Sequence, residues 1–383
     1  MIQPKPNMSS EARVVIFAAR TGGGHWSPAV AIAEELSRLS EGRVKAEVVD
    51  GLYGETGLGY VIEHGYSILI RRARRLWGSF FTLTNKQLTF HFGDAMLRRL
   101  MRKQRCTLKD GPLPAAVVCT NSIILSPIAR ILREDHLDLP YFSVVTDLIT
   151  VHRAWANQDV DFHFSPTNVA GRSLVHYGIS AARIVNTGLP VARSFYPIEP
   201  QKKMQVRTEL GLDQNRPVAL IMHGAEGHTR MLKIAHLLDR KFGSAVEQVV
   251  ITGKNQDLRR KFEEWGPGGH IKVLGFTTQV SEYMKACDVL VTKAGSLTVS
   301  EALACGKPLI ISESLPGQES GTVEWLTSKG AASSAPSAQE VAVQIAYLLS
   351  HPVELEKRSQ NARKLGRPEA ATRAANFLIE QIS

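Results

Sequence analysis

Short apolar runs alternate with helical patterns along most of the chain. Residues 14–19 are continuously apolar and lead into the turn 21–25, after which apolar positions recur at helical spacing as far as Leu39. This order predicts a strand, a glycine turn and a helix. Further apolar runs, most of them separated by helical patterns, predict buried strands at residues 46–49, 115–119, 141–145, 160–164 and 184–185.

The same alternation restarts near residue 217. An apolar run at 218–222 leads into the turn 223–227 and then into a helical pattern at 229–242. Buried strands separated by helices are typical of parallel sheets that are covered on both faces. We therefore predict an α/β protein with two doubly wound, Rossmann-like domains that face each other across a deep ligand-binding cleft. The remaining predicted strands lie at 248–252, 271–274, 289–292 and 308–312.

Two prolines mark the boundary between these domains. Pro197 and Pro200 lie in the polar segment 196–203, which we interpret as the linker between a first domain at 1–195 and a second at 204–353. The final segment, 354–383, has a helical pattern throughout, and packing back on the first domain is one arrangement open to it.

The positive charge of the chain is concentrated in one stretch. The 383 residues are 44% hydrophobic and 21% charged, which is a globular composition, and the net charge is +10. Residues 71–109 hold eleven Lys and Arg but one acid, Asp94, so this stretch accounts for the whole excess. Such a run is usually a solvated face, but basic residues beside aromatic ones suit an anionic membrane surface. The residues predicted to contact lipid are Arg71, Arg72, Arg74, Arg75, Trp77, Phe80 and Phe81.

Several classes of protein and site are disfavoured. Nucleic acid is the rival partner of any basic patch, but we find no recognised nucleic-acid-binding motif. The four cysteines form no CxxC pair, so neither a disulfide framework nor a structural zinc site is expected. No secretory leader and no apolar stretch of about 18 residues are visible. We expect a peripheral protein on the cytoplasmic face of a membrane, with reduced thiols and no metal; no protein partner is inferred.

Two candidate catalytic groups follow predicted strands of the first domain. His25 ends the glycine turn 21–25, where a neutral imidazole beside a substrate hydroxyl would act as a general base. The alternative is a tight turn with a satisfied polar histidine. Asp147 follows the strand at 141–145, with His152 five residues later. Asp147 is either a cleft residue or the N-cap of the next element.

The second domain carries polar turns at equivalent places. After the strand at 289–292, a turn of small residues precedes a helix, and such a turn seats a diphosphate on helix N–H groups. Glu301 lies one turn into that helix, where a carboxylate can accept hydrogen bonds from ribose hydroxyls. The alternative is a capping box, because Thr298 and Glu301 have the required spacing. The turns at 223–227 and 315–319 are open to the same two interpretations, ligand contact or surface turn.

These motifs occur together and in one order in a known family. They are TGGGH at 21–25, VTDLITVH at 145–152, SPTNVAGRSLVHYGI at 165–179, TGLPVARSF at 187–195, ITGKN at 251–255, GFTTQVSEYMKACDVLVTKAGSLTVSEAL at 275–303 and PGQESG at 316–321. The chain resembles the GT-B glycosyltransferases of family 28, and within them the monogalactosyldiacylglycerol synthases and processive diacylglycerol glucosyltransferases. The resemblance covers residues 13 to 331.

The resemblance implies a fold, an activity and a set of roles. It implies a GT-B fold and inverting transfer of galactose or glucose from a UDP-sugar to diacylglycerol at a membrane surface. The UDP-sugar is a substrate, and no cofactor is required. His25 is implied as the base, with Asp147 and His152 assisting it. The implied donor contacts are Gly24, Gly224, Gly227, Phe276, Gly295, Ser296, Thr298, Glu301, Gln318 and Glu319.

Other activities on this scaffold stay open. One is a transferase with another lipid-linked acceptor, such as the peptidoglycan N-acetylglucosaminyltransferase. Another is a UDP-sugar epimerase that needs no lipid, and a third is a non-catalytic peripheral membrane protein. The turn at 294–298 lacks the proline of the plant synthases, and 223–227 reads HGAEG where that group is richer in glycine. Galactose and glucose therefore both remain as donor sugars.

Overall fold

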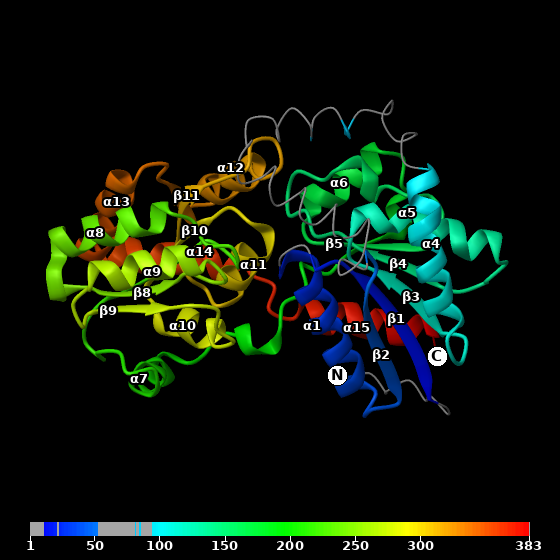
Figure 1. The fold of residues 1–383 in the computed structure, drawn as a ribbon, viewed down its shortest axis with the longest axis horizontal. Coiled ribbons are helices and arrows are strands. Elements are labelled where there is room, and N and C mark those ends of the chain that lie inside the picture. The colour runs from blue at the N-terminus through cyan, green and yellow to red at the C-terminus, as the bar shows by residue number, and fades with distance from the viewer. Residues whose placement is uncertain (1–10, 21–22, 53–80, 82–83, 86–93, 383) are drawn as a thin grey trace. The chain divides into compact units, whose positions relative to one another are not determined.

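The chain forms two compact units. The computed structural model describes residues 11–20, 23–52, 81, 84–85 and 94–382 (Figure 1). The first unit consists of Met1–Ala192, Leu315–Gln318 and Glu369–Ser383, and the second of Arg193–Ser314 and Glu319–Pro368. Each unit is built on its own sheet, as the alternating apolar runs predict.

The first unit contains a six-stranded parallel sheet in the order β2-β1-β3-β4-β5-β6. Its strand β1 is wholly buried from residue 14 to residue 18, and successive side chains enter two different cores. Val15 and Phe17 join the core that includes helix α5 (Ser122–Glu134), whereas Val14 and Ile16 join the core that includes helix α15 (Ala370–Ile382). Because side chains of a strand alternate between faces, a continuous apolar run is needed here. The strands are β1 (Ala12–Ala18), β2 (Val44–Asp50), β3 (Ala116–Cys119), β4 (Tyr141–Val144), β5 (Phe162–Ser165) and β6 (Ile184–Asn186).

The last helix of the chain packs within this first unit. Helix α15 (Ala370–Ile382) contacts α1 (Gly23–Leu39), and Leu378 lies in one core with Ile32. At this contact Glu35 is buried and accepts hydrogen bonds from Arg38 Nη2 and from Thr372 Oγ1, both at 2.7 Å. The other helical elements of the unit are α4 (Asp94–Lys109), α5 (Ser122–Glu134), α6 (Asn168–His176) and the short 3₁₀ turns η2 (Arg153–Trp155) and η3 (Ala181–Arg183).

The second unit repeats the plan with a parallel sheet in the order β12-β11-β10-β7-β8-β9. Strands β7 and β11 are buried along their whole length. The strands are β7 (Val218–Met222), β8 (Glu247–Ile251), β9 (Ile271–Leu274), β10 (Val289–Lys293), β11 (Leu309–Glu313) and β12 (Ala332–Ser334). The helical elements are η4 (Arg193–Phe195), α7 (Pro200–Glu209), α8 (Arg230–Phe242), η5 (Gly243–Ala245), α9 (Gln256–Trp265), α10 (Val280–Ala286), α11 (Ser296–Ala304), α12 (Ser320–Ser328), α13 (Ala338–Ser350) and α14 (Pro352–Leu365).

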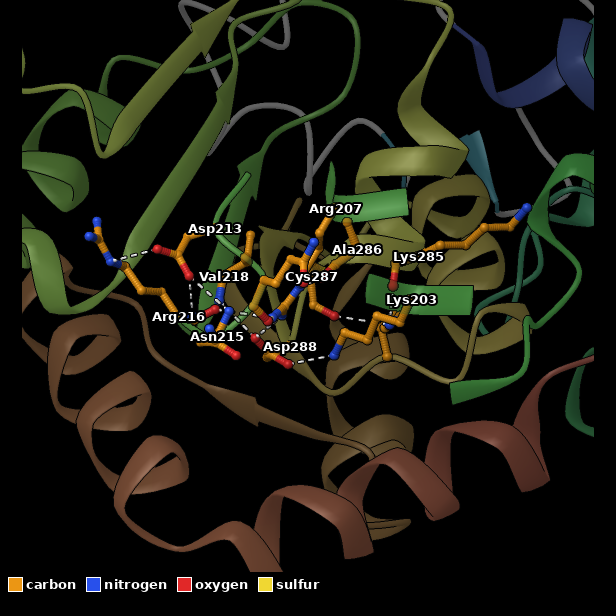
Figure 2. A network of polar contacts seen from close by, with 12 residues as sticks. Lys203, Arg207, Asp213, Asn215, Arg216, Val218, Lys285, Ala286, Cys287 and Asp288 are labelled. Atoms are coloured by element: carbon orange, nitrogen blue, oxygen red, sulfur yellow. Dashed lines mark hydrogen bonds and ion pairs between the residues drawn. The ribbon is translucent and has the colours of Figure 1, made fainter. Parts of the chain in front are cut away.

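A partly buried carboxylate ties α7 to the amino ends of β7 and β10. Asp288 accepts hydrogen bonds from Arg207 Nη2 at 2.6 Å, Lys203 Nζ at 2.5 Å and the backbone N–H of Val218 at 2.7 Å (Figure 2). Burial opposes ionisation of Asp288, but the two cations outweigh it and lower its pKa. The network stabilises the end of the sheet opposite to the turns that follow β7 and β10.

Two segments differ from the sequence-based expectation. The helical pattern predicted for 354–383 is broken between α14 and α15. There Gly366 is so close to α11 that a Cβ would lie 2.3 Å from the carbonyl oxygen of Leu303. Pro368 follows this contact, and proline does not continue a helix. Residues 200–203 of the expected linker form the first turn of α7, because Pro200 is at a helix position that tolerates proline. Among the described helices, none combines the length and apolar character needed to cross a membrane.

Candidate functional site

Two threonines hold the imidazole of His25 at the start of α1. The ring atom Nδ1 lies 2.8 Å from the carbonyl oxygen of Thr120 and 3.0 Å from the hydroxyl of Thr146. The hydroxyl of Thr120 in turn donates to the carbonyl of His25 at 2.8 Å. The two threonines follow β3 and β4, and β3 lies directly beside β1. The carboxyl ends of three strands therefore position one imidazole.

This arrangement selects one tautomer of His25. A carbonyl oxygen only accepts hydrogen bonds, so Nδ1 carries the proton and the neutral ring keeps a lone pair on Nε2. Burial lowers the pKa of His25 to about 4, although the hydrogen bond to Thr120 raises it in part. The imidazole is therefore neutral at pH 7, with Nε2 in the form that a general base requires.

Asp147 organises the loop after β4 and is not bonded to His25 in the structure. Its Oδ2 accepts hydrogen bonds from the backbone N–H of His152 at 3.1 Å and from the indole N–H of Trp155 at 2.9 Å. Burial raises the pKa of Asp147, while these two hydrogen bonds lower it. The buried ring of Trp155 lies 6.5 Å from that of His25. Asp147 thus supports the surroundings of His25 through Trp155.

Both ring nitrogens of His152 are engaged. Nδ1 accepts a hydrogen bond from the backbone N–H of Ala154 at 3.1 Å, so the neutral ring carries its proton on Nε2, which lies 3.2 Å from the hydroxyl of Thr84. Burial lowers the pKa of His152 to about 4. The ring also contacts Phe81 edge-on, with centroids 5.1 Å apart. These contacts favour a positioning role for His152.

The predicted lipid-binding stretch is described in part. Phe81 is 7% exposed, so its ring is buried and not at the surface. The other six residues of that set lie outside the described residues. On α4, Arg102 and Lys103 are exposed, and Arg105 and Lys109 form ion pairs with Asp135 at 2.9 Å. Part of the positive charge is therefore neutralised within the first unit.

In the second unit, α11 begins without a side-chain cap. The N-cap is Gly295, and the first helical residue is Ser296. Thr298 is consequently inside the helix, so the capping box that its spacing with Glu301 suggests does not form. A helix of nine residues whose N-terminus has no capping side chain presents N–H groups and a partial positive charge to an anion.

Glu301 is a buried carboxylate on this helix. It is 8% exposed, and burial raises its pKa to about 8. Within the described part of the chain, its carboxylate forms no hydrogen bond or ion pair. Burying an acid without a partner is costly unless it remains protonated or meets a donor. Hydroxyl groups of a ligand would provide that donor.

The glycines of the turn after β7 serve close backbone packing. Gly227 has a φ of +54°, and a Cβ there would lie 2.5 Å from the carbonyl oxygen of Thr252. Gly253 has a φ of +63°, and a Cβ would lie 2.2 Å from the carbonyl oxygen of Ala225. Gly224 also has a positive φ, +71°. The turns after β7 and β8 therefore fit against each other only because both contain glycine.

The remaining predicted residues lie at ends of strands or helices. Phe276, after β9, is 66% exposed, with Lys254 Nζ 5.8 Å from its ring centroid. Glu319 precedes α12, is 7% exposed and pairs with Lys293 Nζ at 2.9 Å. Gln318 belongs to the short segment grouped with the first unit. Gly24 is in the first turn of α1, and a Cβ there would meet nothing within 4 Å.

We call His25 with its contacts the first half-site, and the start of α11 with Glu301 and Glu319 the second half-site. Four residues of these two half-sites were not predicted from the sequence. Thr120, Thr146 and Trp155 surround His25, and Lys293 lies beside Glu319. Each of them except Trp155 lies at or just after the carboxyl end of a predicted strand, and that position was the available signal. Among the residues that the structure describes, no group of three or more His, Cys, Asp or Glu is arranged to hold a metal ion.

Comparison with known proteins extends over nearly the whole chain. The monogalactosyldiacylglycerol (MGDG) synthase family model matches residues 25–191, and the glycosyl transferases group 1 model matches residues 205–365. Monogalactosyldiacylglycerol synthase 1 of Arabidopsis thaliana is 28% identical, over 97% of this chain and 71% of the relative. Probable monogalactosyldiacylglycerol synthase 2 of Oryza sativa is 32% identical, over 93% of this chain and 78% of the relative.

Solved structures share the fold at low identity. Anabaena HepE in complex with UDP-glucose has a TM-score of 0.58 at 15% identity, over 97% of this chain and 98% of that one. UDP-GlcNAc 2-epimerase from Neisseria meningitidis has a TM-score of 0.64 at 14% identity, over 96% and 99%. The predicted GT-B-type fold with two parallel-sheet domains is thus confirmed. The sequence relatives identify the family: the chain belongs to the monogalactosyldiacylglycerol synthases.

Proposed function

We propose that this protein transfers a hexose from a UDP-sugar to the hydroxyl of diacylglycerol at a membrane surface, with inversion at the anomeric carbon. The observation that carries the proposal is the state of His25. Its proton is held on Nδ1 by a backbone carbonyl, and its pKa is lowered to about 4. A neutral imidazole with an unprotonated Nε2 can accept the proton that an alcohol acceptor must lose as it attacks.

The second unit supports the proposal with groups that suit a nucleotide-sugar. The uncapped start of α11 suits the diphosphate, and the buried carboxylate of Glu301 suits the ribose hydroxyls. The exposed ring of Phe276 offers a stacking surface for uracil, and Glu319 offers a carboxylate to the sugar. The names of the sequence relatives specify galactose and diacylglycerol, so we expect UDP-galactose to be the faster donor.

The transfer is a single displacement. Nε2 of His25 removes the proton of the diacylglycerol hydroxyl, and the oxygen forms a bond to the anomeric carbon. The bond between that carbon and the β-phosphate oxygen breaks on the opposite face, which inverts the configuration. UDP departs with the electron pair, and the N–H groups at the start of α11 stabilise its charge. No cofactor takes part, and the two substrates supply every atom that moves.

Membrane association completes the proposal, since diacylglycerol resides in a bilayer. The exposed Arg102 and Lys103 of α4 would contact anionic headgroups, together with the basic stretch that precedes them in the sequence. Removing the acidic lipid should therefore slow transfer. Equal rates on neutral and anionic vesicles would contradict this part of the proposal.

A lipid-product assay tests the activity. Purified protein is given labelled UDP-galactose or UDP-glucose with diacylglycerol in anionic vesicles, and the chloroform-soluble product is identified. We expect a labelled monoglycosyldiacylglycerol of β configuration, formed faster from UDP-galactose. No labelled lipid from either donor, in protein that binds UDP, would overturn the proposal. Conversion of the UDP-sugar without lipid would point to epimerisation.

A further inference from the structure

Lys293 is a cation at the second half-site to which neither the sequence motifs nor the proposed reaction assigns a role. It is the last residue of β10, two residues before the N-cap of α11. The pairing of β10 with β11 shifts register between Thr292 and Lys293. Such irregularities re-aim a side chain at the end of a strand. The side chain of Lys293 remains 33% exposed, so a ligand can reach it.

The side chain of Lys293 lies beside two glycines, one in the turn after β7 and one at the N-cap of α11. A Cβ on Gly295 would lie 3.0 Å from Lys293 Nζ, and a Cβ on Gly224 would lie 3.7 Å from Lys293 Cε. Glycine at position 295 leaves room for the ammonium group, whereas the distance at Gly224 is an ordinary van der Waals contact. The ammonium group is therefore next to the N–H groups proposed to receive the diphosphate.

The partner of Lys293 connects this position to the sugar. Its Nζ forms an ion pair with Glu319 Oε1 at 2.9 Å, and Glu319 is the carboxylate proposed to contact the hexose. That oxygen would lie 3.7 Å from a Cβ on Gly295. The ammonium group of Lys293 is therefore beside both proposed donor contacts: the start of α11, which would receive the diphosphate, and Glu319, which would contact the hexose. A lysine with three N–H donors can keep its carboxylate partner while it donates to a phosphate.

We propose that Lys293 neutralises the donor diphosphate and the departing UDP, with Glu319 as its partner before the donor binds. The inference rests on the proposed function and adds a specificity-determining residue to it. Negative charge on the β-phosphate grows as the bond to the anomeric carbon breaks. A cation placed there in advance favours the transition state and selects a diphosphate over an uncharged nucleoside.

Calorimetry with UDP and with uridine tests the proposal without any lipid. The variants are Lys293→Met, Lys293→Arg as the charge-retaining control, and Glu319→Gln. The Lys293→Met variant should bind UDP about tenfold more weakly than the wild type, or weaker still, because it loses a charge-assisted hydrogen bond. Uridine binding should stay unchanged, and Lys293→Arg should retain most of the UDP affinity. Glu319→Gln should bind UDP as tightly as the wild type or more tightly, because the ammonium group loses its competing partner.

Three outcomes would overturn the assignment. One is an unchanged UDP-to-uridine affinity ratio in Lys293→Met, and another is an equal loss of both ligands, which indicates a structural role. The third is a loss of UDP affinity in Glu319→Gln as large as that in Lys293→Met. In each of these cases the wild type still binds UDP, so the proposed function stands. A wild-type protein that binds neither UDP nor UDP-hexose contradicts the proposed function itself.

Discussion

The two half-sites differ in how their polar groups are satisfied. In the first half-site the protein itself supplies the hydrogen-bond partners. Thr120 and Thr146 bond to His25, and the indole N–H of Trp155 donates to Asp147. On α11 the helix starts without a capping side chain, and Glu301 is buried with no hydrogen-bond partner among the described residues. The first arrangement is prepared for chemistry before substrate arrives. The second leaves donors and acceptors for a ligand to satisfy.

The difference also appears in the protonation states. Burial lowers the pKa of His25 to about 4, which leaves the imidazole neutral at pH 7, with the lone pair of Nε2 unprotonated. Burial raises the pKa of Glu301 to about 8, which leaves it mainly protonated at pH 7 before a ligand binds. Burial thus favours the uncharged form of both groups: it keeps His25 deprotonated and Glu301 protonated. Ligand hydroxyls that donate to Glu301 would restore that charge.

The largest expected effect is on the chemical step. His25→Ala should lower transfer by about 10²- to 10⁴-fold, the range that a general base contributes. His152→Ala is the matched control, because His152 is also a neutral imidazole with a pKa of about 4 in the same unit, but both of its nitrogens are engaged. The His152→Ala variant should unfold at a lower temperature than the wild type, but should keep far more transfer activity than His25→Ala. Glycolipid formation is measured beside thermal unfolding, and equal losses of activity in the two variants would refute the distinction.

A smaller effect is expected on donor affinity and its pH dependence. Binding should favour ionised Glu301, whose pKa in the free protein is about 8, so one proton leaves as the ligand binds. The affinity for UDP-galactose should therefore rise by up to about tenfold per pH unit between pH 6 and 8. Glu301→Gln should abolish this slope and weaken binding by about tenfold to 100-fold.

Calorimetry without lipid measures both quantities in buffers of different ionisation enthalpy. UDP-galactose is the ligand of choice, since it has no terminal phosphate that titrates in this range. A wild-type affinity that is flat with pH, with no proton released, would show that Glu301 is not the acid that the donor ionises.

The smallest effect is expected from the glycine turns. Gly253→Ala places a Cβ 2.2 Å from the carbonyl oxygen of Ala225, so the turn after β7 must move. Gly266→Ala is the matched control, since its φ of +64° is left-handed like the +63° of Gly253 and a Cβ there meets nothing within 4 Å. Both variants pay roughly 1–2 kcal/mol for the left-handed backbone. Only Gly253→Ala should unfold at a still lower temperature and bind UDP less tightly; equal melting temperatures would remove the steric argument.

The sheets were predictable because their signal is local. The apolar runs at 14–18 and 218–222 are buried, as continuous runs in parallel sheets should be. His25 was equally accessible to sequence reasoning, because a glycine turn directly follows the first of these strands. In both cases the evidence lies within about ten consecutive residues.

The partners of His25 could not be found in this way. Thr120 and Thr146 come from segments 95 and 121 residues away, and the strand order β1-β3-β4 brings them together. Periodicity does not encode that order. The alternative interpretation of Thr298 and Glu301 as a capping box is wrong, because the helix begins at Ser296 although their spacing fits that motif. Local spacing cannot tell which residue starts a helix when glycine provides the N-cap.

The central claim is that His25 serves the chemical step and Glu301 serves donor binding. Measuring transfer at saturating donor tests this claim most directly. Rates of glycolipid formation are measured for His25→Ala and Glu301→Ala as UDP-galactose is raised to saturation. We predict that Glu301→Ala recovers most of the wild-type rate, since it lacks affinity, whereas His25→Ala stays slow at every donor concentration. Recovery of His25→Ala by excess donor, or failure of Glu301→Ala to recover at saturating donor, would contradict the account.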